Sequence, residues 1–86
     1  SDTKIIRKNK IQIEKSIGYK SSYRIKWQSP CKYSLTYLTV GKEKHKYLLG
    51  ETINVEIIAV LDNKRYIYRG NLLDRTKVIG IMKKLN

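Results

Sequence analysis

The fold is decided by residues 23–37, YRIKWQSPCKYSLTY, where two runs of alternating apolar and polar residues flank a proline. Tyr23, Ile25 and Trp27 alternate with polar residues before Pro30, and apolar residues recur at every second position after it. A period of two is typical of antiparallel strands with one buried and one solvated face. Proline has no N–H for a central strand. The stretch therefore predicts a hairpin with its loop at Pro30.

The same period recurs along the chain. Short strands are expected before Gly18, and further runs occur at 53–61, 65–69 and 78–82. The longest run predicts a central strand, with Ile53, Val55, Ile57, Ala59 and Leu61 on one face. Asp62 and Asn63 tolerate left-handed backbone and predict a tight turn. Residues 41–50 are expected to form a basic loop, and helical structure only as one turn within 72–77. These features predict an all-β fold, a small antiparallel meander of six or seven strands that forms a closed or partly closed barrel or a curled sheet.

Length and charge limit the remaining interpretations. With 86 residues the chain is expected to be a single domain, 1–86. Nineteen Lys and Arg against seven Asp and Glu give a formal charge of +12, which favours an anionic partner: nucleic acid, an acidic protein or an anionic membrane surface. The alternative is a lysine-rich composition without a binding role, as in proteins of A/T-rich genomes. No run of about 18 apolar residues predicts a transmembrane segment, and no signal peptide is visible.

Residues for catalysis or metal binding are sparse. His45 lies in a lysine-rich loop and is expected to be solvated rather than a general base. Cys31 is the only cysteine, so an internal disulfide and a cysteine-based zinc site are excluded, and burial is expected for it. Carboxylates and glycines occur singly, without a metal-ligand cluster or a phosphate-binding loop. We therefore expect no catalytic site, no metal and no cofactor.

Basic residues spread along the chain are the one sequence feature that suggests a binding surface. Six cations and no acid occur from Lys15 to Lys42. Such cations suit phosphate contacts if their strands lie close together in the sheet. The aromatic residues fall on the opposite face, as core residues would, which weakens the case for base stacking. The candidate anion-binding or nucleic-acid-binding residues are Arg24, Lys26, Lys32, Arg65 and Arg69.

Residues 27–35 also carry a W-x₃-C-x-Y-x-L pattern, formed by Trp27, Cys31, Tyr33 and Leu35. The pattern resembles that of small, uncharacterised β-rich proteins of Bacteroidetes-type bacteria, often made with an export or lipoprotein signal. The resemblance extends loosely to residues 11–14, 50–57 and 82–84. It implies a compact β fold and a cell-envelope or periplasm-facing location, with Ser1 following a removed signal segment; otherwise a cytoplasmic location is expected. It assigns no activity.

Three functions remain open. The first is a non-enzymatic envelope or interaction domain, motivated by the missing catalytic residues. The second is a small-barrel nucleic-acid-binding module that uses a basic sheet face. The third is a binder of an acidic protein, with the loop 42–46 as the contact.

Overall fold

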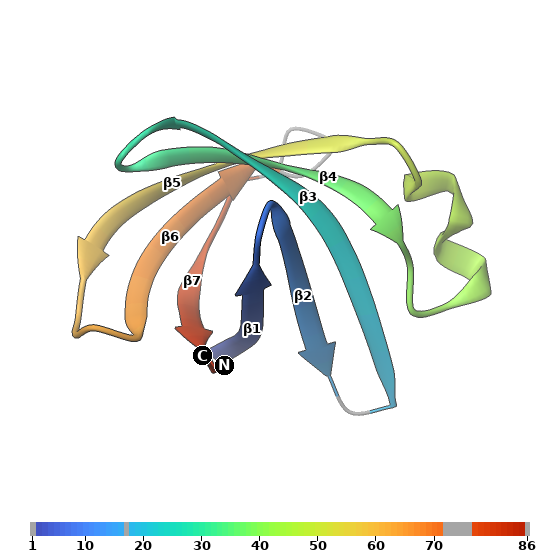
Figure 1. Cartoon of the computed structure of the whole chain (residues 1–86), viewed down its shortest axis with the longest axis horizontal. Coiled ribbons are helices and arrows are strands. Elements are labelled where there is room, and N and C mark those ends of the chain that lie inside the picture. The colour runs from blue at the N-terminus through green and yellow to red at the C-terminus, as the bar shows by residue number, and fades with distance from the viewer. Residues whose placement is uncertain (1, 17, 72–76, 86) are drawn as a thin grey trace.

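The computed structural model describes residues 2–16, 18–71 and 77–85 of the chain. Its seven strands follow one another around a closed barrel, which confirms the all-β prediction (Figure 1). One 3₁₀ helix, η1, spans Glu43–Leu48 between β4 and β5. The strands are β1 Asp2–Lys8, β2 Ile11–Ser16, β3 Tyr19–Ser29, β4 Lys32–Thr39, β5 Thr52–Val60, β6 Arg65–Asn71 and β7 Lys77–Lys84.

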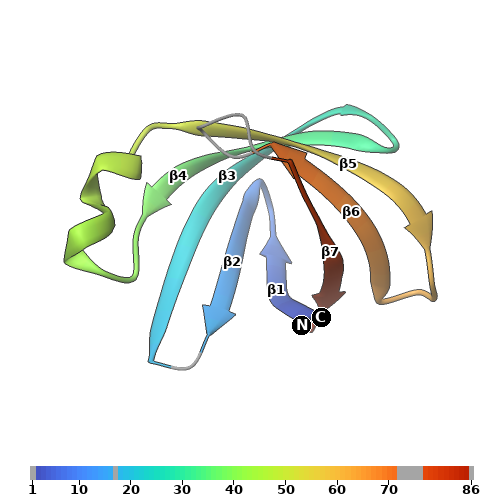
Figure 2. The same ribbon diagram turned by 180° about the vertical axis from the view of Figure 1, so that it is seen from behind.

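The barrel closes by a parallel pairing between its first and last strands, whereas the sequence predicted an antiparallel meander. Consecutive strands pair antiparallel, whereas β1 pairs parallel with β7. The number of strands explains the difference, because directions alternate along a meander and the first and seventh strands then run the same way. The Leu85 N–H continues the seam by donating to the Ile5 carbonyl at 2.8 Å. Both ends of the chain therefore lie side by side (Figure 2).

The apolar core lies inside the barrel and contains three of the tyrosines that the sequence pattern placed there, Tyr23, Tyr33 and Tyr66. Tyr33 and Leu35 of β4 are buried, and Tyr66 of β6 packs with them. Side chains fill the interior of so narrow a barrel, and full burial of a large apolar side chain contributes about 1.5–3 kcal/mol. The buried hydrophobic residues are Ile5, Tyr23, Ile25, Tyr33, Leu35, Val55, Tyr66 and Met82.

Polar side chains of β1 and β2 also point inward. The pairing places Arg7 opposite Gln12 and Ile5 opposite Glu14, and Gln12 is fully buried. Arg7 Nε donates to Gln12 Oε1 at 2.8 Å, and Arg7 Nη2 donates to the Tyr66 hydroxyl. The barrel interior thus contains a partly buried guanidinium, and the isoleucines that alternate with Gln12 lie on the other face of β2.

Aromatic rings surround this guanidinium. The Arg7 Cζ lies 4.8 Å from the Tyr33 ring centroid, 5.5 Å from that of Tyr66 and 5.4 Å from that of Trp27. A cation held over ring faces at such distances is attracted by their quadrupoles. The Tyr33 and Tyr66 hydroxyls share a hydrogen bond of 2.7 Å. Arg7 therefore ties β1 to β3, β4 and β6 across the barrel.

Glu14 is the acidic side chain of the interior. The Tyr23 hydroxyl donates to its Oε2 at 3.2 Å. Burial raises the pKa of Glu14 above its ordinary value, and the Tyr23 hydrogen bond only partly opposes this. A buried carboxylate that ionises at neutral pH therefore costs stability, because the folded state favours the protonated form.

Glu14→Gln is expected to raise the urea midpoint at pH 7. The folded pKa of Glu14 lies above the unfolded one, so its contribution is fully present below the unfolded pKa and is lost as pH rises through the folded pKa. The gain should therefore shrink as the pH falls toward 4, where the wild-type carboxyl is protonated too. Urea unfolding at both pH values measures it, and Glu51→Gln on the exposed chain before β5 is the control. An equal gain at both pH values would contradict this assignment.

Three local expectations were wrong. Residues 43–48 form η1 rather than a plain loop. A β-bulge between Ile57 and Ala59 changes the face, so Ala59 pairs with outward-facing Ile67 instead of sharing the inner face with Ile57. β5 is also not a central strand, since a closed barrel has none. The predicted helical turn lies largely in 72–76, outside the described residues.

The hairpin residues divide between core and surface. The turn at 30–31 joins β3 to β4 as predicted, and Tyr33 and Leu35 are core residues. Cys31 is exposed, against the expected burial, because it lies at the tip of the hairpin. Trp27 is 46% exposed although its ring packs 4.8 Å from that of Tyr33. The Trp27 side chain therefore packs against Tyr33 and Arg7 with nearly half of its surface exposed, rather than lying inside the barrel.

Candidate functional site

The strand register gathers basic side chains on the outer face of β3–β7. Arg24 and Lys26 alternate with the inward-pointing Tyr23 and Ile25, and Lys32 precedes the inward-pointing Tyr33. Their cross-strand partners are small and polar: Arg24 lies opposite Thr36, and Lys26 opposite Ser34. The three candidates on β3 and β4 therefore share one surface.

A second cross-strand row carries this surface onto β5 and β6. Lys32 pairs with Glu56, and Glu56 pairs with Arg69. On the far side of β6, Asn71 pairs with Lys77 of β7. Neighbouring strands lie about 4.8 Å apart, so the cations follow roughly 19 Å of the curved barrel wall from β3 to β7. We call the five residues Arg24, Lys26, Lys32, Arg69 and Lys77 the basic band.

Arg65, the remaining candidate from the sequence, is not counted in the basic band because Asp62 holds it in a turn. It begins β6 four residues before Arg69, about 13 Å along the strand. Asp62 in the β5–β6 turn accepts hydrogen bonds of 2.9 Å from the Arg65 Nε and from its backbone N–H. The same Asp62 carboxylate accepts from the Lys64 N–H at 2.9 Å, as in the predicted tight turn. Arg65 therefore stabilises a turn.

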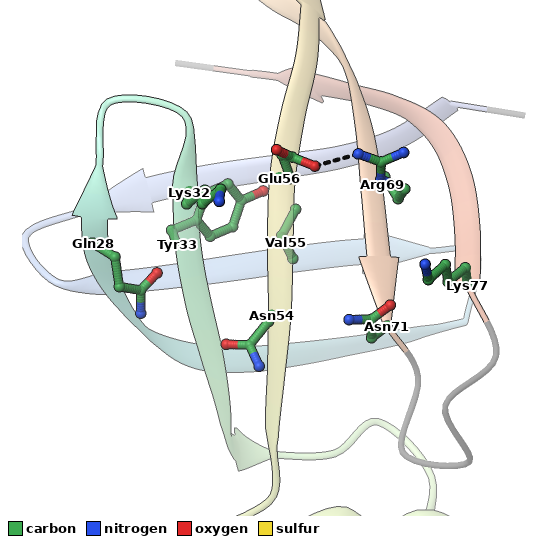
Figure 3. A pocket seen from close by; sticks show the side chains of 9 residues that line it. All are labelled: Gln28, Lys32, Tyr33, Asn54, Val55, Glu56, Arg69, Asn71 and Lys77. Atoms are coloured by element: carbon green, nitrogen blue, oxygen red, sulfur yellow. Dashed lines mark hydrogen bonds and ion pairs between the residues drawn. The ribbon is translucent and has the colours of Figure 1, made fainter.

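A groove with a volume of about 580 Å³ lies within the basic band. Figure 3 shows its side chains on β3, β4, β5, β6 and β7. Three cations and three side-chain amides border it, together with one carboxylate, and the inward-facing Tyr33 and Val55 complete its wall. The lining residues are Gln28, Lys32, Tyr33, Asn54, Val55, Glu56, Arg69, Asn71 and Lys77.

Glu56 provides the negative charge of the groove. Its Oε1 accepts from Arg69 Nη2 at 2.5 Å, with both side chains partly exposed. The hydrogen bond and the charge of Arg69 lower the pKa of Glu56, and Lys32 lowers it further. The carboxylate is therefore ionised at neutral pH. Lys32, Arg69 and Lys77 outnumber it, so the groove keeps a net positive charge.

Sequence reasoning missed the amides, Glu56 and Lys77. Lys77 and Asn71 border a stretch of the sequence that contains no strand pattern, and Glu56 looked like one of several scattered acids. Alternation did place Glu56 opposite the core residues Val55 and Ile57. These residues come together only because their strands are neighbours in the barrel, and the sequence pattern does not show which strands are neighbours.

The residues considered for catalysis do not come together. His45 lies in η1, beyond the end of β4, and Cys31 precedes the start of β4. The length of β4, about 24 Å, separates them. Across the described ranges no three His, Cys, Asp or Glu side chains form a group that could hold a metal ion. In the loop proposed for an acidic partner, Lys46 pairs with Glu43 at 2.5 Å.

Two searches beyond the site complete the description. Among the described helical residues none forms a segment long and apolar enough to cross a membrane. Comparison with models of protein families, with curated proteins and with solved structures found no match to this chain.

Proposed function

We propose that this protein is a non-enzymatic interaction domain that binds the sugar-phosphate backbone of a nucleic acid in the groove between β3 and β7. The observation that carries the proposal is the basic band: five cations from four strands on the outer face of the barrel, three of which, Lys32, Arg69 and Lys77, line a groove with a single carboxylate. Lys and Arg side chains neutralise phosphates, and this sequence-independent attraction dominates the affinity of such complexes.

The position of the aromatic rings supports backbone contact rather than base stacking. Tyr23, Tyr33 and Tyr66 are buried in the barrel. On β3–β7 the described outward positions opposite them carry no aromatic side chain, and Lys, Arg, Glu, Gln, Asn, Ser and Thr predominate there. Proteins that stack bases place aromatic side chains beside the basic surface. We therefore expect binding with little base preference and a strong dependence on salt.

Binding of a fluorescently labelled oligonucleotide at increasing salt tests the proposal. The affinity should fall steeply, with a slope in log K against log salt of about −0.7 per phosphate contacted on a single strand. Lys32→Gln should weaken binding to all sequences alike, because Lys32 reaches the groove from β4. It should also make the slope less negative by about 0.7, the contribution of one phosphate contact. Lys44→Gln on η1 removes the same charge away from the groove and should leave the slope unchanged.

Two results would overturn the proposal. One is no binding at low salt. The other is equal weakening by Lys32→Gln and Lys44→Gln, which would mean that net charge alone drives the association. Vesicles of anionic phospholipid provide a further arm: tight vesicle binding without oligonucleotide binding would assign the basic band to a membrane surface. The cell-envelope location implied by the sequence resemblance stays a prediction.

A further inference from the structure

Glu56 is an unfavourable residue for a groove that receives only phosphates. It lies between Lys32 and Arg69 in one cross-strand row, and its carboxylate is a groove-lining group. A carboxylate only accepts hydrogen bonds, and it repels a phosphate that enters beside it. A ligand compensates for this repulsion if it carries a hydrogen-bond donor next to its phosphates.

We propose that Glu56 accepts a hydrogen bond from a ribose 2′-hydroxyl, so that the nucleic acid held in the groove is RNA. This inference rests on the proposed function. The order cation, carboxylate, cation along Lys32, Glu56 and Arg69 matches the order phosphate, sugar hydroxyl, phosphate along an RNA strand. Proteins distinguish RNA from DNA at a given position by this hydroxyl, and a carboxylate is a known acceptor for it in nucleotide sites.

Arg69 can hold the carboxylate and a phosphate together. A guanidinium has five N–H donors in a planar arrangement, and Arg69 directs its Nη2 at Glu56 (Figure 3). The other N–H groups of the guanidinium can donate to a phosphate oxygen. The Glu56–Arg69 ion pair therefore orients the carboxylate for the sugar and need not break when the ligand enters.

Three oligonucleotides that differ only at the 2′ position test the inference. They are oligouridylate, its 2′-deoxy form and its 2′-O-methyl form, each about 12 nucleotides long to cover a small barrel. The methylated form keeps the ribose oxygen but removes the donor. Wild-type protein should bind oligouridylate about tenfold more tightly than either analogue, since a hydrogen bond to a charged group is of that strength.

Glu56→Gln should reduce this ratio to about twofold or less, mainly by raising the affinity for the deoxy form, because the repelling charge is gone. Glu51→Gln, on the chain just before β5 and outside the groove, removes the same charge and should leave the ratio unchanged. Equal wild-type binding of all three oligonucleotides would overturn the inference and leave the proposed function standing. Methylated RNA bound as tightly as RNA would overturn it too. No binding of any oligonucleotide would overturn the proposed function itself.

Discussion

Replacing Arg7 with alanine is expected to lower the free energy of unfolding by about 3 kcal/mol, the largest stability loss that the described contacts imply for one polar residue. Gln12 and the Tyr66 hydroxyl would each lose a hydrogen bond inside the barrel. The Trp27, Tyr33 and Tyr66 rings would lose the cation between them, which is worth up to about 2 kcal/mol where water is excluded. The missing side chain would also leave a cavity between these rings.

Urea unfolding followed by far-ultraviolet circular dichroism measures this loss. Trp27 fluorescence is a poorer probe, because its ring contacts the mutated side chain. Domains of this size are stable by only about 5–15 kcal/mol, so 3 kcal/mol shifts the midpoint strongly. Lys8→Ala, on the exposed neighbouring position of β1, should change the midpoint little. A loss below about 0.5 kcal/mol for Arg7→Ala would mean that water replaces the guanidinium without cost.

Arg7→Met separates the charge from the packing. Methionine keeps an unbranched stem that fills irregular gaps, but it offers no donors. Replacement of buried ionic groups by well-packed apolar residues is often neutral. A smaller loss for Arg7→Met than for Arg7→Ala would assign the difference to the filled volume, and the remaining loss to the partners left without Arg7.

The barrel could be predicted from the sequence because most of its strands carry an unambiguous period of two. Tyr33 and Leu35 alternate with polar residues, so their inward orientation follows directly, and structure confirms it. β2 is different. Its alternation is just as regular, yet the inner face holds Gln12 and Glu14. Alternation says that two faces differ, and only the partner strand decides which one is inside.

The bulge at Ile58 could not be predicted for a related reason. Residues 57–60 are apolar on both faces, so a shift by one residue leaves the pattern unchanged. How much of the candidate site could be predicted was limited by the strand order, which the sequence does not show. Arg24, Lys26 and Lys32 are close in the sequence and could be grouped on a hairpin, whereas Arg69 and Lys77 join them only because β5, β6 and β7 continue the same face. Arg65 was separable in principle, since Asp62 precedes it by three residues in a turn.

Reversing two charges of the basic band is expected to have the largest effect on binding. In Lys26→Glu with Lys77→Glu, both ends of the band would repel phosphate instead of attracting it. Affinity for an oligonucleotide at low salt should fall on the order of 100-fold, as expected when several phosphate contacts are lost. Folding should change little, because Lys26 lies opposite Ser34 and Lys77 opposite Asn71, so neither reversal breaks a cross-strand ion pair.

The matched control is Lys8→Glu with Lys44→Glu, on β1 and η1, which changes the net charge by the same amount. If the basic band binds the nucleic acid, the control should lose only the few-fold affinity that a lower overall charge predicts, and the loss should vanish with moderate salt. Both proteins should unfold at similar urea concentrations. A control as weak as the band variant would locate the attraction in the whole charged surface. A band variant that still binds tightly would place the partner on another face, and the carboxylate of Glu56 would then have no ribose to select.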